Sequence, residues 1–167
     1  MFVVAICGPL ESNVKQFALE LRKRISLPVT MIYEQDSTES HAEILADLAR
    51  AEGLVLLVGH RLFLNDRLEH LSGHEFKIKI FFETDPETCL INLMKRKKDD
   101  DATATIKLYE TIFKPLNEQI NASRKMAHII IPKSDDYSAS FDLLCSSLND
   151  KKYLGLEFGV SKEPRFF

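Results

Sequence analysis

The chain begins with the stretch Phe2-Val3-Val4-Ala5-Ile6-Cys7-Gly8-Pro9-Leu10-Glu11-Ser12-Asn13-Val14-Lys15. The six residues that follow Met1 are apolar and three of them are β-branched, which is typical of a strand buried on both faces. Gly8-Pro9 ends this run, and apolar side chains then recur at helical spacing as far as Leu21, with Ser12 as the expected N-cap. A strand, a glycine-led loop and a helix N-terminus in this order can hold a phosphate.

The loop lacks the groups that nucleotide chemistry requires. A nucleotide-binding loop uses a second glycine to wrap the anion, a lysine for the outer phosphates and a hydroxyl for magnesium. The chain has Asn13, Val14 and Lys15 at these positions, and Glu11 adds negative charge where a triphosphate would lie. Lys15 is expected to point elsewhere, because it lies about 100° around the helix from Val14. A remnant of the phosphate site is therefore predicted at Gly8, Ser12, Asn13 and Lys15.

The composition predicts one soluble domain. The chain has 167 residues, 45% hydrophobic content and a formal net charge of −3, so it offers no overall field for nucleic acid. Cys7, Cys89 and Cys145 each lie in an apolar stretch without metal-ligand spacing, which favours reduced thiols in the core. Membrane spans need about 20 apolar residues, and no run approaches that length. We expect a cytoplasmic protein without a metal site or a membrane contact.

Five apolar segments alternate with amphipathic ones along the chain. Further strands are expected at residues 29–33, 54–58, 77–83 and 128–132, and further helices at residues 38–51, 86–98, 105–122 and 137–148. Asp85-Pro86-Glu87 is a strong helix start, and the helix over 105–122 should bend or restart at Pro115. The apolar, core-facing positions are expected at Leu108, Ile112, Leu116 and Ile120 in that helix, and at Phe141, Leu144, Cys145 and Leu148 in the last one. This alternation predicts an α/β fold, a three-layer α/β/α sandwich around a five-stranded parallel sheet.

Asp36 is the candidate catalytic carboxylate beside the predicted sheet. It follows the second strand, at the edge where α/β proteins place their chemistry. Alternatively, Asp36 only caps the helix that follows. The third strand ends at Val58, where a phosphotransferase would carry a magnesium-binding carboxylate. His70 and His74 are expected in a solvated loop, because no further ligand stands at metal spacing.

Two cationic segments are candidate contact surfaces. Lys95-Arg96-Lys97-Lys98 ends a predicted helix, and is either a solvated helix end or a lid or patch for an anionic partner. Residues 151–167 form a second unit after the domain at 1–150, an aromatic and weakly basic tail that docks on its own domain or on a partner. The candidate partner-binding residues are Lys95, Arg96, Lys97, Lys98, Lys151, Lys152, Tyr153, Phe158, Arg165, Phe166 and Phe167.

The chain resembles the uridine kinase family of P-loop nucleoside kinases, which is related to phosphoribulokinase. The segments that carry the resemblance are Lys79 to Thr88 with Leu90, Tyr109 with Lys114-Pro115 and Glu118, Lys125 to Pro132, and Leu54 to Leu68 with Gly59. Gly8 and Ser12 match the family's phosphate loop, Asp36 matches its substrate-side acid, and Arg96 is the arginine kept in its lid helix.

The same resemblance locates what the chain lacks. Asn13, Val14 and Lys15 replace the family's glycine, lysine and hydroxyl, Val58 replaces its glutamate, and Cys89, Asn92 and Leu93 largely replace its lid arginines. The family's nucleoside-binding insertion is cut to the helix predicted over 38–51. Because these groups all act on one transition state, their joint loss predicts a pseudoenzyme with a degenerate Walker A loop.

We therefore expect a catalytically inactive protein, without a cofactor, that binds a larger complex. A protein complex and a ribonucleoprotein such as the ribosome both fit, since basic side chains meet phosphates and aromatic rings stack on RNA bases. One alternative is a divergent nucleoside kinase that uses ATP and magnesium, with Asp36 as base and Lys15 or Arg96 on the phosphates. A second alternative is a sensor that binds a nucleotide without turnover.

Overall fold

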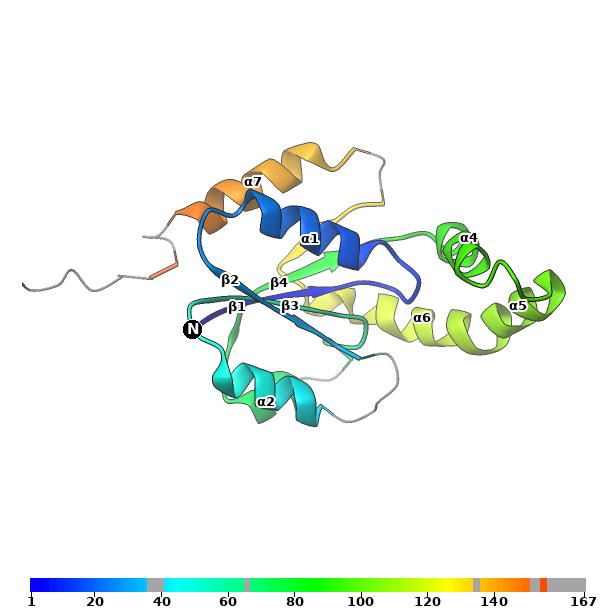
Figure 1. Cartoon of the computed structure of the whole chain (residues 1–167), viewed down its shortest axis with the longest axis horizontal. Helices are drawn as coiled ribbons and strands as arrows, with labels where there is room; N and C mark the ends of the chain where they lie inside the picture. The colour runs from blue at the N-terminus through cyan, green and yellow to red at the C-terminus, as the bar shows by residue number, and fades with distance from the viewer. Residues whose placement is uncertain (36–40, 65–66, 134–135, 151–153, 156–167) are drawn as a thin grey trace, which may run out of the picture.

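The computed structural model describes residues 1–35, 41–64, 67–133, 136–150 and 154–155. Five strands form one parallel sheet in the order β2-β3-β1-β4-β5, which confirms the predicted sheet (Figure 1). The strands are β1 (Phe2–Cys7), β2 (Val29–Tyr33), β3 (Leu54–Gly59), β4 (Phe76–Phe82) and β5 (Ile129–Ile131). β1 is central and β2 lies at one edge, so the residues that follow β1 are flanked by the ends of β3 and β4.

Helices cover both faces of the sheet, as the predicted three-layer sandwich requires. The helices are α1 (Val14–Arg24), α2 (Ala42–Arg50), α3 (Arg67–Ser72), α4 (Pro86–Arg96), α5 (Ala102–Leu108), α6 (Lys114–Ala122) and α7 (Ser138–Asn149). Figure 1 shows α1 and α7 on one face and α2 on the other, while α4 and α5 project beyond the carboxyl edge of the strands. None of the described helices is long and apolar enough to cross a bilayer.

Alternation along β1 divides the core into two halves. All six residues of β1 are buried. Val4 and Ile6 pack in a cluster with α1 and α7, whereas Val3 and Ala5 pack in a cluster with α2, α3 and α6. Successive side chains of a strand point to opposite faces, so an uninterrupted apolar run is what a doubly covered central strand needs.

The long helix predicted over 105–122 is interrupted before Pro115. A π-helix, Tyr109–Phe113, joins α5 to α6. A proline inside an α-helix clashes with the carbonyl four residues back, here that of Thr111, and a wider turn at this place relieves the clash. The turn also rotates the buried face: Tyr109 is buried, whereas Ile112, expected to face inward, is 57% exposed.

Other local predictions have mixed outcomes. Asp85 caps α4 through a hydrogen bond from the Thr88 N–H to its Oδ1 at 2.8 Å, as predicted. The Ser12 cap is wrong: α1 begins at Val14, and its N-cap is Asn13. All three cysteines are buried and free, as expected. His70 lies in α3 and only His74 in a loop, and both are exposed.

Leu154 lies beyond the expected domain boundary but belongs to the main core. Only 5% of its surface is exposed, in the cluster that contains Ile25 and Leu148. Nearby, Asn149 ties the end of α7 to the end of α1, because its Nδ2 donates to the Arg24 carbonyl at 3.0 Å and its Oδ1 accepts from the Ser26 N–H. Leu154 itself is therefore packed on the domain that precedes it.

Candidate functional site

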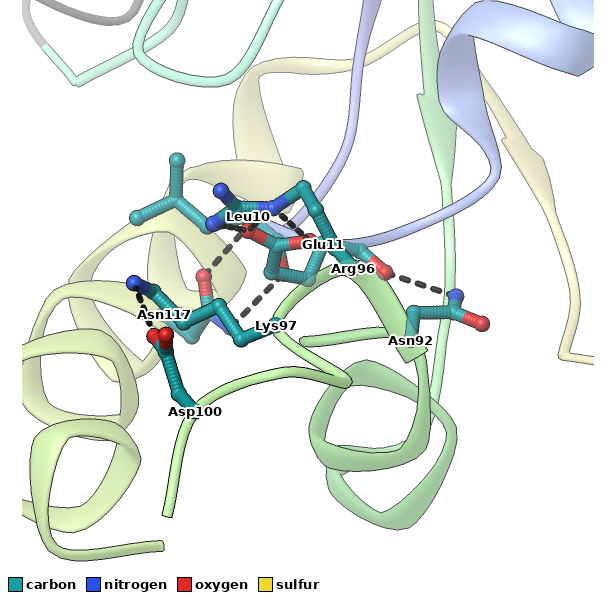
Figure 2. Close-up of polar contacts among 7 residues, drawn as sticks. All are labelled: Leu10, Glu11, Asn92, Arg96, Lys97, Asp100 and Asn117. Atoms are coloured by element: carbon teal, nitrogen blue, oxygen red, sulfur yellow. Dashed lines mark hydrogen bonds and ion pairs between the residues drawn. The ribbon is translucent and has the colours of Figure 1, made fainter. Parts of the chain in front are cut away.

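The loop from Gly8 to Asn13 joins β1 to α1 at the carboxyl edge of the sheet. Its backbone is unusual at Glu11, whose φ of 61° lies in the left-handed region that a side chain disfavours. Such a conformation costs on the order of 1 kcal/mol and persists only where neighbouring contacts impose it. Contacts of this kind reach the loop from α4 and from α6 (Figure 2).

Helix α4 binds the loop through two side chains. Arg96 Nε donates to both carboxylate oxygens of Glu11, at 3.0 and 3.2 Å, and its terminal nitrogen makes a third contact with the same carboxylate. One turn earlier, Asn92 Nδ2 donates to the Glu11 carbonyl at 2.8 Å and contacts Asn13 Oδ1 at 3.3 Å. Only 14% of the Glu11 side chain is exposed. Arg96 is thus paired with a carboxylate of the loop itself.

Helix α6 holds the other side of the loop through Asn117. Its Oδ1 accepts the Leu10 N–H at 2.7 Å, and its Nδ2 donates to the Leu10 carbonyl at 3.2 Å (Figure 2). Asn117 is buried and the two bonds are partly buried, so one side chain satisfies a backbone donor and a backbone acceptor together. The loop therefore depends on two helices that lie more than 80 residues further along the chain.

Hydrophobic side chains fill the positions where a phosphotransferase would carry its charged groups. Val14, at the lysine position, is 1% exposed and packs in the core with Phe17 and Phe82. Val58, at the position where a phosphotransferase would carry a magnesium-binding carboxylate, is fully buried in the same core. Neither side chain can reach a phosphate or a metal ion. Among the described residues, no group of three His, Cys, Asp or Glu side chains could hold a metal.

A buried glutamate that sequence reasoning passed over lies at the same edge. Glu34 follows β2, and its Oε2 accepts the N–H groups of His60 at 2.6 Å and Arg61 at 2.9 Å. Arg61 Nε lies 3.4 Å from the other oxygen. A Cβ at Gly59 would come within 2.7 Å of Glu34 atoms, so this position requires glycine. Its position directly after the strand predicted over 29–33 is the feature of the sequence that points to Glu34, since Asp36 was predicted as a site residue from the same position.

The same cluster includes His60 and Cys7. His60 is buried and its Nδ1 lies 2.9 Å from the Gly8 carbonyl, which ties the end of β3 to the start of the loop. The Cys7 thiol donates to the His60 carbonyl at 3.1 Å. Burial, and secondarily the negative charge of Glu34, raise the pKa of Cys7 to about 12, so this thiol is a packing group and not a nucleophile.

Two cavities flank the loop and differ in charge. The first, of about 460 Å³, is lined by Leu10, Glu11, Ser12, Lys15, His60, Arg61, Arg96, Ile112, Phe113 and Leu116. The second, of about 560 Å³, is lined by Asn13, Gln16, Phe82, Glu83, Thr84, Asp85, Thr88, Pro132, Lys133 and Tyr137. Three cations and one carboxylate face the first cavity, whereas two carboxylates and one cation face the second.

The predicted site residues divide into those that the structure brings together and those it does not. Gly8, Ser12, Asn13, Lys15 and Arg96 meet at the loop. Lys15 is among the residues that line the first cavity. The hydroxyl of Ser12 is buried and has no hydrogen-bond partner among the described residues. Asp36 lies outside the described residues.

The cationic segment from Lys95 to Lys98, at the end of α4, contains two residues that form ion pairs with acidic side chains. Arg96 binds Glu11, and Lys97 binds Asp100 at 3.0 Å, so two of the four cations have acidic partners in the chain (Figure 2). Lys95 and Lys98 are exposed. The other candidate partner-binding residues lie outside the described part of the chain: Lys151, Lys152, Tyr153, Phe158, Arg165, Phe166 and Phe167.

Several solved structures have the same fold at low identity. Shikimate kinase from Aquifex aeolicus gives a TM-score of 0.60 at 15% identity, over 92% of this chain and 99% of that one. Shikimate kinase from Bacteroides thetaiotaomicron gives 0.56 at 12% identity, over 93% and 99%. An uncharacterized protein from Eubacterium ventriosum gives 0.55 at 15% identity, over 90% and 99%. No family model and no curated protein sequence matches the chain. The fold is that of the P-loop kinases.

Proposed function

We propose that this chain is a uridine-kinase-like pseudoenzyme, a P-loop kinase fold that has lost phosphoryl transfer and acts by binding. In this role it is a regulatory factor for a larger protein or ribonucleoprotein complex such as the ribosome. Its contact surfaces are the segment after Leu154 and the exposed cations Lys95 and Lys98 at the end of α4. ATP and magnesium have no part in this function.

The ion pair between Glu11 and Arg96 carries the proposal. Phosphoryl transfer depends on cations that neutralise the charge of the moving phosphoryl group. Here the loop supplies its own anion, and the lid arginine is bound to it in three contacts. A triphosphate entering the loop would meet the carboxylate of Glu11, and the buried Val14 in place of a lysine. The residues present therefore do not fit magnesium-ATP.

The first experiment measures nucleotide binding and turnover. Calorimetry with ATP, GTP and UTP, with and without magnesium, is expected to show no binding, and the purified protein is expected to hydrolyse or transfer no phosphate. Magnesium-dependent turnover that is lost in Asp36→Asn would overturn the proposal in favour of a divergent nucleoside kinase. Micromolar nucleotide binding without turnover would replace it with a nucleotide sensor.

The second experiment identifies the partner by affinity purification at low and high salt. Deletion of residues 156–167 is expected to abolish capture and leave the melting temperature nearly unchanged, because the deletion begins after the buried Leu154. Lys95→Ala with Lys98→Ala should weaken capture, whereas Lys107→Ala, an exposed cation on α5, should not. Loss of capture at high salt would indicate contacts between charges, as expected for RNA phosphates. Equal capture by the deletion variant and the full chain would contradict the proposed tail contact.

A further inference from the structure

The first cavity combines charged and apolar walls in the way that small-molecule sites do. Ligand sites are mostly apolar hollows with a few convergent polar groups, and their volumes range from about 300 to 1,000 Å³. This cavity has a volume of about 460 Å³. It lies at the carboxyl edge of the sheet, where the loop, the end of β3 and the π-helix meet.

Its charged wall is assembled from three separate elements. Lys15 comes from the first turn of α1, Arg61 follows β3, and Arg96 ends α4. Arg61 is held in place, since its terminal nitrogen donates to the Gln35 carbonyl at 3.2 Å while its Nε faces Glu34. The Arg96 guanidinium already binds a carboxylate through two nitrogens, Nε to one oxygen and a terminal nitrogen to the other. Arginine recognises carboxylates and phosphates in this geometry.

Its apolar wall comes from the π-helix and α6. Ile112, Phe113 and Leu116 line the same cavity as the cations. Ile112 is 57% exposed, although the helical pattern of the sequence placed it in the core. The wide turn before Pro115 accompanies this displacement, and it adds Ile112 to the apolar residues that line the cavity.

We propose that this cavity binds a small molecule with one oxyanion, a carboxylate or a phosphate, on an apolar body, and that Glu11 competes with it for Arg96. The oxyanion takes the place of the Glu11 carboxylate, while the apolar body lies against Ile112, Phe113 and Leu116. The inference rests on the proposed function, because the ligand is bound without a nucleotide and without transfer.

The competition predicts a gain of affinity in one variant, which a misfolded protein could not give. Titrations would use benzoate and phenyl phosphate as the two oxyanions, benzyl alcohol as the neutral control and inorganic phosphate as the control without an apolar body. At least one of the two aromatic anions should saturate and bind more tightly than either control. Glu11→Gln should tighten that binding roughly fivefold by removing the competing carboxylate.

Matched substitutions separate the site from general charge effects. Glu43→Gln removes one negative charge from the exposed surface of α2 and should leave the affinity unchanged. Lys15→Ala should weaken binding, whereas Lys23→Ala, an exposed cation on the same helix, should not. The inference fails if neither aromatic anion saturates, or if Glu11→Gln and Glu43→Gln bind alike. Magnesium-ATP turnover is assayed separately, so a failure of the proposed function can be told apart from a failure of this inference.

Discussion

Asn117 shows how one side chain can organise a loop that lies 107 residues away in sequence. Its amide group matches the N–H and carbonyl of Leu10 and fixes the first half of the loop, while Glu11 is fixed by α4. The left-handed backbone at Glu11 lies between these two attachments. A residue that disfavours this conformation is thus held in it by bonds on both sides.

Asn117→Ala is expected to lower the free energy of unfolding by about 1 to 3 kcal/mol, because it leaves the partly buried N–H of Leu10 without an acceptor. Urea denaturation followed by circular dichroism measures the change. Glu118→Ala, an exposed substitution on the same helix, is the control and should change stability by less than about 0.5 kcal/mol. Equal midpoints for the two variants would show that Asn117 does not hold the loop.

At the scale of elements, α4 has a cap at its start and the loop contacts near its end. Asp85 accepts the N–H of Thr88 at the first turn, and Asn92 and Arg96 bind the loop from the last two turns. Tyr109 in the π-helix adds a brace, since its hydroxyl donates to the Pro86 carbonyl at 3.0 Å. Between these contacts, Cys89, Leu93 and Tyr109 form a small apolar cluster. The orientation of α4 over the loop follows from all of them.

Removal of the cap should give a pH-dependent loss of stability. The pKa of Asp85 lies below its ordinary value of 3.8, mainly because the Asp85 carboxylate accepts a hydrogen bond from the Thr88 N–H. A depressed pKa adds stability above the ordinary value, and that stability is lost as the pH falls through the folded-state pKa. Asp85→Ala should therefore cost about 1 kcal/mol at pH 7 and progressively less below pH 3.8.

Urea unfolding at pH 7, 5 and 3 tests this expectation. Asp85→Asn, which keeps a capping side chain without the charge, should stay close to wild type at pH 7. Asp99→Ala, an exposed acid after α4, is the control with no cap to lose. A deficit for Asp85→Ala that stays constant from pH 7 to pH 3 would exclude a contribution from the carboxylate charge.

Across the whole molecule, the candidate site and the end of the described chain lie at opposite edges of the sheet. The loop, Glu34, His60 and α4 gather at the carboxyl ends of the strands, whereas Asn149 contacts the end of α1 before β2 begins. The two proposed binding activities have separate measurements: partner capture for the segment after Leu154, and titration with small anions for the cavity.

The thiols report on the integrity of the entire core. Burial raises the pKa values of Cys7 and Cys89 to about 12 and also raises that of Cys145. At pH 8 a pKa of about 12 leaves roughly one thiol in ten thousand ionised. Ellman's reagent should therefore find no fast-reacting thiol in the native protein and three after denaturation in guanidinium. Ser146→Cys, exposed beside Cys145, should add one fast-reacting thiol. A fast phase in the wild type would show that the core opens locally.

The sequence by itself determined the sheet, its covering helices and the groups missing from the phosphate loop. These features depend on short-range patterns: the apolar run before Gly8, the helical spacing after it, and residue identities at fixed intervals. The cap at Asp85 and the inward face of α7 were predictable for the same reason.

Only the tertiary structure decided how the remaining side chains are paired. The partners of Glu11, Leu10 and Glu34 are 85, 107 and 26 residues away, and no local pattern encodes a separation of that kind. The π-turn before Pro115 likewise moves Ile112 from a predicted core face to a cavity wall, because local strain is relieved by a change of helical phase. The loop that identifies the fold in the sequence is thus, in three dimensions, bound by side chains of α4 and α6 and lies beside a cavity lined by cations.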